Sequence, residues 1–157
     1  MKTKKILLIS LAMILVLMVT FGCMPSRTFR DAEGNSVTVS GGGDTMTIKG
    51  EDGDATVTTG SAAKWPSDKV GDLPELKGNV IAVIDTPDGL MIQLEGVKQS
   101  DFTAYVEKLK KAGYESAAEM EVEGTIMFMG VKGDKVVNAM FSADDSTGTA
   151  VITYGDN

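Results

Sequence analysis

A single amphipathic helix among alternating segments is the feature that most restricts how this chain can fold. Residues 101–114 read DFTAYVEKLKKAGY, with Ser100 expected to cap the helix and Gly113 to end it. Four apolar residues follow the spacing of one helical face: Phe102, Tyr105, Val106 and Leu109. Most apolar residues after position 36 instead alternate with polar ones, as in strands. The sequence therefore predicts a sheet with one helix to cover it.

The C-terminal half, residues 79–157, carries the main part of this sheet. Strands are expected at residues 79–85, 90–97, 125–131, 135–141 and 149–154. Thr86-Pro87-Asp88-Gly89 is a turn sequence, so the first two strands form a hairpin. Residues 115–123 are acidic and are either a loop or an edge strand. We predict an α+β fold, a two-layer ββαβββ antiparallel sheet with one helix.

The second face of this sheet needs a cover. The strand at 125–131 is apolar on both faces, and its neighbour at 135–141 repeats the pattern. One helix covers one sheet face. We expect the N-terminal meander or Trp65 to cover the other. The alternative cover is a partner, either an envelope protein or an apolar ligand, because Met-rich surfaces adapt to varied shapes.

Residues 36–59 form a weak nine-residue repeat that predicts a short β-meander. Each unit is a turn of Gly and acids followed by an alternating strand. The period resembles that of calcium β-rolls, but Val37, Met46 and Ala55 stand where that motif has its Asp ligands. We interpret the acids at the turns as turn formers and predict no metal site: Asp44, Asp52 and Asp54.

The segments on either side of the meander have little that could pack. Residues 23–35 are polar and are expected to form a tether. Residues 60–78 contain two Pro and are expected to form a linker, from which Trp65 packs into the domain that follows.

Composition excludes several classes of function. The chain has no His, which excludes His-dependent catalytic triads and His-based metal sites. Its one Cys excludes an internal disulfide. Lys2, Lys4 and Lys5 are three of the 15 basic residues, so residues 23–157 hold 12 basic against 22 acidic side chains, a net charge of −10. That charge argues against nucleic acid as a partner.

The first 22 residues have the three-part layout of an export signal. Basic residues precede the uncharged run ILLISLAMILVLMVTF at 6–21, and Gly22 and Cys23 follow. A lone Cys after a small residue resembles the lipobox of bacterial lipoproteins, although Thr20 and Phe21 depart from the usual Leu and small residue. The resemblance implies cleavage between Gly22 and Cys23. It also implies that Cys23 is S-diacylglycerylated and N-acylated, which places the chain on the extracytoplasmic side of the cell membrane.

A second resemblance covers about residues 60–155. The pairs Trp65-Pro66, Leu73-Pro74 and Lys77-Gly78, followed by the helix at 101–114, resemble Firmicute-type surface lipoproteins with a C-terminal domain of unknown function. This resemblance implies a location and a fold, and it implies no reaction or cofactor.

The sequence thus favours a membrane-anchored, non-catalytic binding or structural module. The first alternative is a carboxylate-based hydrolase at the cell surface, because without His acid-base work falls to carboxylates or Lys. Its candidate groups are Asp144, Asp145, Glu119, Glu121 and Glu123. The second alternative is an accessory solute-binding lipoprotein, which the short chain disfavours because there is no room for two lobes.

Overall fold

The computed structural model describes residues 26–30, 36–42, 44–50, 53–144 and 147–156. These residues form ten strands, one α-helix and one short 3-10 helix. In chain order the elements are β1 (Arg27–Arg30), β2 (Ser36–Gly42), β3 (Thr45–Gly50), β4 (Gly53–Thr59), η1 (Gly60–Ala62), β5 (Asn79–Thr86), β6 (Gly89–Val97), α2 (Gln99–Lys111), β7 (Glu115–Val122), β8 (Thr125–Lys132), β9 (Lys135–Asp144) and β10 (Thr147–Asp156).

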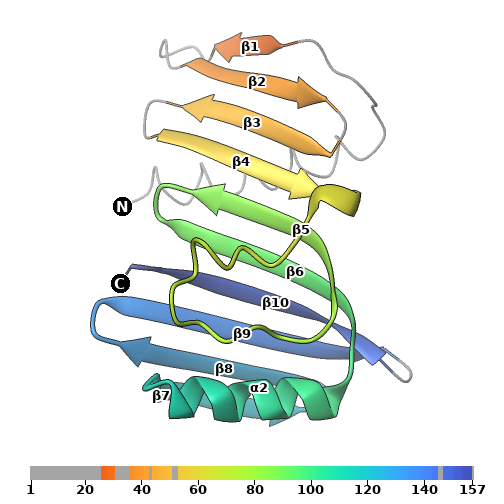
Figure 1. Ribbon diagram of the computed structural model, residues 1–157, viewed down its shortest axis with the longest axis vertical. Coiled ribbons are helices and arrows are strands. Elements are labelled where there is room, and N and C mark those ends of the chain that lie inside the picture. The colour runs from red at the N-terminus through yellow and green to blue at the C-terminus, as the bar shows by residue number, and fades with distance from the viewer. Residues whose placement is uncertain (1–25, 31–35, 43, 51–52, 145–146, 157) are drawn as a thin grey trace.

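All ten strands belong to one antiparallel sheet. Their order is β1-β2-β3-β4-β5-β6-β10-β9-β8-β7, and Figure 1 shows them stacked from β1 at the top to β7 at the bottom. After β6 the chain crosses through α2 to the far edge. It then steps back through β8 and β9, so that β10 closes the sheet beside β6. The predicted α+β class, an antiparallel sheet with one helix, is confirmed.

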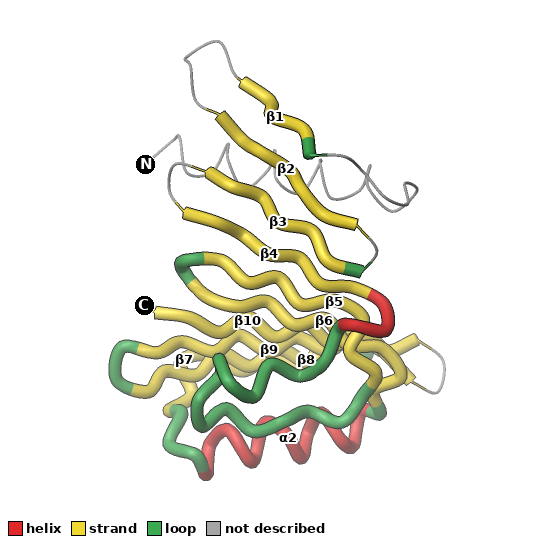
Figure 2. Tube along the Cα trace, turned by 45° about the horizontal axis from the view of Figure 1, so that its top comes forward, coloured by secondary structure: helices red, strands yellow, loops and turns green. Residues whose placement is uncertain are grey.

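The helix and the segment before β5 cover the same face of the sheet. α2 contacts β8, β9 and β10, and residues 63–78 pass in front of the middle strands on the same side (Figures 1 and 2). The core lies between these layers. Phe102 of α2 stacks on Phe141 of β9 with ring centroids 5.5 Å apart. The largest side chains there are almost fully buried: Phe102, Tyr105, Leu109, Tyr114, Phe128 and Phe141.

The helix begins earlier than its sequence signals indicate. Lys98 is the N-cap residue, and the backbone N–H of Phe102 donates to its carbonyl oxygen at 3.0 Å. The prediction that Ser100 caps the helix is therefore wrong. β6 ends at Val97, so Lys98 alone links strand to helix and the first turn starts at once. The predicted end is confirmed, because Gly113 has φ +96° and the N–H of Tyr114 bonds back to Leu109.

Residues 115–122 form a strand, β7, at one edge of the sheet. The sequence left a loop or an edge strand open here, and the predicted order ββαβββ lacks this strand. The observed order after β4 is ββαββββ. β7 pairs with β8 from Glu115↔Val131 to Val122↔Thr125, with a bulge between Ser116 and Ala118.

The predicted meander forms, but it does not lie over the second face. β4 pairs edge to edge with β5 through Thr56↔Asp85, Val57↔Ile84, Thr58↔Val83 and Thr59↔Ala82. β1, β2 and β3 continue the same sheet, so part of the expected tether is a strand. The prediction that the meander covers the second face is therefore wrong, because backbone pairing adds these strands beside β5.

Residues 60–78 differ from the expected linker because they contribute to the core. Val70, Leu73 and Leu76 are buried in the cluster that α2 and the sheet share. Trp65 packs against that same cluster, on the helix side. It therefore does not cover the second face, contrary to the second part of that prediction.

Candidate functional surface

The face of the sheet opposite α2 carries two rows of mostly apolar side chains that cross the strands. Residues paired directly across antiparallel strands lie on the same face. One row joins neighbouring strands from β7 to β10: Met120, Met127, Met140 and Val151. The other joins strands from β7 to β3: Ala118, Met129, Asn138, Thr153, Met91, Ile84, Val57 and Met46. We call the part of this face on β6, β10, β9, β8 and β7 the Met-rich face.

Five methionines of the Met-rich face are exposed. Met91, Met120, Met127, Met129 and Met140 have between 37% and 46% of their surface accessible, and Val122 has 52%. Their neighbours along the same strands point the other way and are nearly inaccessible, as at Phe128 and Ala139, both 0%. Monomeric proteins rarely leave a contiguous apolar patch of this kind uncovered, and such patches mark contact surfaces.

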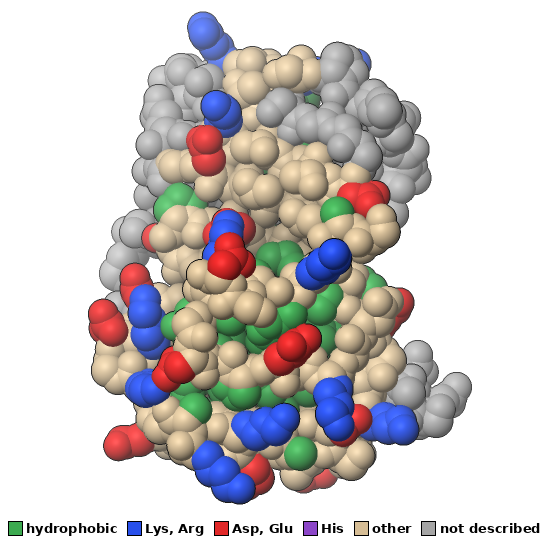
Figure 3. Space-filling view, in the orientation of Figure 1, with side chains coloured by type: hydrophobic (Ala, Val, Ile, Leu, Met, Phe, Trp, Pro, Cys, Tyr) green, Lys and Arg blue, Asp and Glu red, His purple; other side chains and the backbone are tan. Residues whose placement is uncertain are grey.

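Charged groups are concentrated elsewhere. Figure 3 looks onto the helix side, where acidic and basic side chains are scattered over the surface. Among the residues of the Met-rich face whose side chains the structure describes, the carboxylates are Glu95 and Glu115, and they lie near its margins. The polar groups between the methionines are uncharged: Gln93, Asn138 and Thr153. The sequence prediction of a strand that is apolar on both faces is confirmed at β8.

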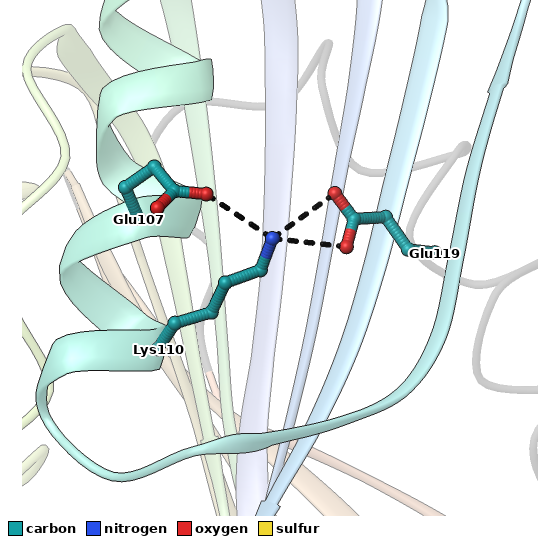
Figure 4. Close-up of polar contacts among 3 residues, drawn as sticks. All are labelled: Glu107, Lys110 and Glu119. Carbon is teal, nitrogen blue, oxygen red and sulfur yellow. Dashed lines mark hydrogen bonds and ion pairs between the residues drawn. The ribbon is translucent and has the colours of Figure 1, made fainter.

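The acidic series of β7 is tied to the helix and is not gathered into a catalytic pair. Figure 4 shows Lys110 of α2 between Glu107 and Glu119, with its Nζ 3.1 Å from Glu107 Oε1 and 3.0 Å from Glu119 Oε2. The hydrogen bond with Glu119 is the larger cause and that with Glu107 the smaller one, and together they raise the pKa of the Lys110 ammonium. Glu121 accepts a hydrogen bond from Gln99 at 3.3 Å, and Glu123 occupies a turn with φ +47°.

The other predicted acids within the described residues, Asp44, Asp54 and Asp144, lie in different parts of the chain and are not grouped as a metal site. Asp44 lies in a turn just before β3 and accepts a hydrogen bond from Ser61 at 2.8 Å, and Asp54 is exposed at the start of β4. Asp144 is the last residue of β9, while Asp52 and Asp145 lie outside the described residues. Within the described ranges, no three acidic or Cys side chains are grouped so that they could hold a metal ion.

Tyr105 of α2 and Tyr114 just after the helix have the largest pKa shifts among the described groups, and the sequence indicated only packing roles for them. Burial raises the pKa of Tyr105, whose hydroxyl is buried without a hydrogen-bond partner. Burial also raises the pKa of Tyr114, whose hydroxyl donates to Asp72 at 3.4 Å. Lys132 pairs with the same Asp72 and lowers the pKa of that carboxyl. Tyr114, Asp72 and Lys132 join residues 63–78 to the sheet, whereas Tyr105 is buried in the core.

A shallow depression lies at the turn between β5 and β6. It is lined by Tyr154 and by two ion pairs, Lys69 with Asp85 and Lys135 with Asp156. Each lysine already has a carboxylate partner, so the depression offers little charge to a ligand. The Met-rich face is therefore the stronger candidate surface.

The predicted lipid-attachment and cleavage residues, Cys23 and Gly22, lie outside the described residues. In the part of the chain that the structure describes, no helix has the length and apolar character needed to cross a membrane. Comparison with models of known protein families, with curated proteins and with solved structures found no match.

Proposed function

We propose that this chain is a bacterial, Firmicute-type surface lipoprotein that acts as a non-catalytic binding or structural module on the extracytoplasmic side of the cell membrane. In this proposal residues 1–22 are removed as a signal peptide and Cys23 carries the lipid. The observation that carries the binding role is the Met-rich face, a broad apolar surface that no described part of the chain covers.

The sequence around Cys23 supports the anchor. An uncharged run of sixteen residues is followed by Gly22 and the lone Cys23, and the first described strand starts at Arg27, four residues after that Cys. A mature chain with a net charge of −10 is repelled by anionic head groups. Two or three acyl chains overcome that repulsion, because each buried CH₂ contributes about 0.8 kcal/mol.

The surroundings of the carboxylates support a non-catalytic role. A general acid or base needs a pKa close to the working pH, which burial or a neighbouring like charge provides. Glu119 is instead half exposed and paired with Lys110. The alternative functions remain a carboxylate-based hydrolase and an accessory solute-binding lipoprotein. Turnover of a glycoside or peptide by the purified chain, abolished by Asp144→Asn or Glu119→Gln, would favour the hydrolase.

Metabolic labelling tests the anchor. Cells that express the chain are fed an alkyne-bearing fatty acid, and the protein is isolated for fluorescence and intact mass. We expect label and a lipid mass increment on the wild type, and neither on Cys23→Ser. An unlabelled wild-type chain with a free thiol that washes off membranes would refute the proposed location.

A further inference from the structure

We propose that the Met-rich face binds the same face of a second copy of this chain, so that two sheets pack into a face-to-face dimer. The inference rests on the proposed function, because it names the partner of the surface assigned there. It concerns the strands β6, β10, β9, β8 and β7, whose outward residues are exposed or half-buried.

Charge favours a second copy on this face over the other surfaces of the molecule. Two mature chains, residues 23–157, each carry a net charge of −10 and repel one another wherever acidic surfaces meet. The middle of the Met-rich face has Gln93, Asn138 and Thr153 as its polar residues, and the carboxylates whose side chains are described there, Glu95 and Glu115, lie toward its margins. Two copies can therefore approach through this face without burying opposed carboxylates. A partner recognised by ion pairs would find few groups to pair with.

The size of the face suits a stable dimer. Five strands spaced about 4.8 Å apart and about nine residues long, at about 3.3 Å per residue, span roughly 700 Å². A standard interface buries about 800 Å² on each partner. The face is thus close to the area that a specific contact requires.

Side-chain lengths on this face make it complementary to itself. β10 lies between β6 and β9 and presents the short side chains Val151 and Thr153. Met91 on one flank and Met140 on the other are longer and exposed. A two-fold axis that passes over β10 brings the short β10 side chains of the two copies together, and the longer methionines of each copy fill the space on either side of them. Sheets that pack in this way interdigitate their side chains at a spacing of about 10 Å.

The lipid anchor strengthens this association. Chains held at one membrane surface meet at a higher effective concentration than free chains do. Unbranched methionine side chains also adjust to the small misfits between two twisted sheets.

Disulfide trapping tests the geometry. Thr153 is exposed near the middle of the face, so Thr153→Cys brings the new thiol close to its own copy across the two-fold axis. The matched control is Ala104→Cys on the exposed side of α2. In the full chain, both in cell membranes and in detergent, we expect oxidation to give a disulfide dimer of Thr153→Cys and none of Ala104→Cys. Absence of a Thr153→Cys dimer in both settings overturns the proposal.

Sedimentation of the full chain in density-matched detergent measures the affinity. Met140→Lys places a charge on the face, and Ala104→Lys places the same charge on the helix side. We expect a wild-type dimer, at least a tenfold rise in the dissociation constant for Met140→Lys, and no change for Ala104→Lys. Circular dichroism of both variants checks that they remain folded, and Met140→Gln serves if the lysine disturbs folding. A wild-type chain that stays monomeric, or an unchanged constant for a folded Met140→Lys, overturns the dimer.

Photo-crosslinking separates this inference from the proposed function. A photoreactive residue in place of Met127 is expected to capture a second copy of this chain. Capture of a different envelope protein or of an apolar ligand overturns the second-copy proposal and leaves the proposed binding module intact. Loss of the lipid label at Cys23 would instead remove the proposed anchor, while the sedimentation result would still decide the dimer.

Discussion

The two faces of the sheet are built by the same strands but have different surroundings. On the helix side, Phe128, Ala139 and Ile152 are fully inaccessible beneath α2 and residues 63–78. On the other side, Met127 and Met140 are exposed, although they differ from the first group by a single step along β8 and β9. The covered face uses rigid aromatic and branched residues, while the open face uses flexible methionine. The difference indicates that the first face holds the fold together and the second is available for contact.

The largest contrast is expected for a carboxylate placed on either side of β9. Ala139 and Met140 are neighbours that point to opposite faces, 0% and 45% exposed. Ala139→Asp buries an unpaired charge and should lower the free energy of unfolding by about 4 kcal/mol or more. Met140→Asp should change it by about 1 kcal/mol or less. Urea unfolding at sub-micromolar concentration measures both, and equal losses would break the comparison.

Truncation of a large side chain should show the next largest contrast. Phe102→Ala removes a ring that stacks on Phe141 and should cost about 3–5 kcal/mol. Met127→Ala, on the open face, should cost about 1 kcal/mol or less, since its side chain is already partly in water. The same urea titrations compare them. A Met127→Ala loss as large as that of Phe102→Ala would mean that the open face is covered.

On the covered face, tight packing should make even a small added side chain destabilising, whereas on the open face a small change should have little effect on stability. A Cβ atom at Gly130 would lie 2.7 Å from the Phe128 ring and 3.0 Å from Tyr114 Cβ. Gly130→Ala should therefore destabilise by about 1–3 kcal/mol. Thr153→Ala on the open face should stay within about 0.5 kcal/mol. Thermal melts of the two variants give the comparison, and a neutral Gly130→Ala would show that the covered layer is loose.

The ion pair between Asp72 and Lys132 should add a small acid-sensitive contribution on the covered side. Lys132 lowers the folded-state pKa of Asp72, so the stability it contributes is present above about pH 4 and lost as pH falls further. Both groups are partly exposed, so we expect less than about 1 kcal/mol. Between pH 6 and pH 2, the free energy of unfolding should fall less for Asp72→Asn than for the wild type. Unchanged pH dependence would contradict this.

The smallest effect is expected where α2 holds the edge strand. Lys110→Met removes the contacts with Glu107 and Glu119 shown in Figure 4. Exposed pairs of this kind contribute little, so the free energy of global unfolding should hardly change. In Lys110→Met, the rate of amide hydrogen exchange should nevertheless increase more in β7 than in β9. The reason is that β7 has only one neighbouring strand among those described. Lys108→Met on the exposed side of α2 is the control, and identical exchange in the two variants would contradict a role for Lys110.

Local patterns in the sequence determined the helix, the main strands and the two apolar faces. The spacing of Phe102, Tyr105, Val106 and Leu109 identified the helical face that is buried, and alternation at 125–131 identified a strand apolar on both sides. These features depend on neighbours within a few residues, so they can be read from one chain. The same reasoning produced the predicted lipid attachment at Cys23, which remains a prediction.

Only the tertiary structure decided which surface each segment contacts. Edge-to-edge pairing of β4 with β5 uses backbone groups that every residue carries, so the sequence could not separate that position from packing on a face. Val70, Leu73 and Leu76 became core because α2 and the sheet left space that they fill, and no periodic pattern indicates this. Since the meander lies at the sheet's edge and Trp65 on the helix side, no described segment covers the Met-rich face. That outcome depends on contacts between residues far apart in the chain.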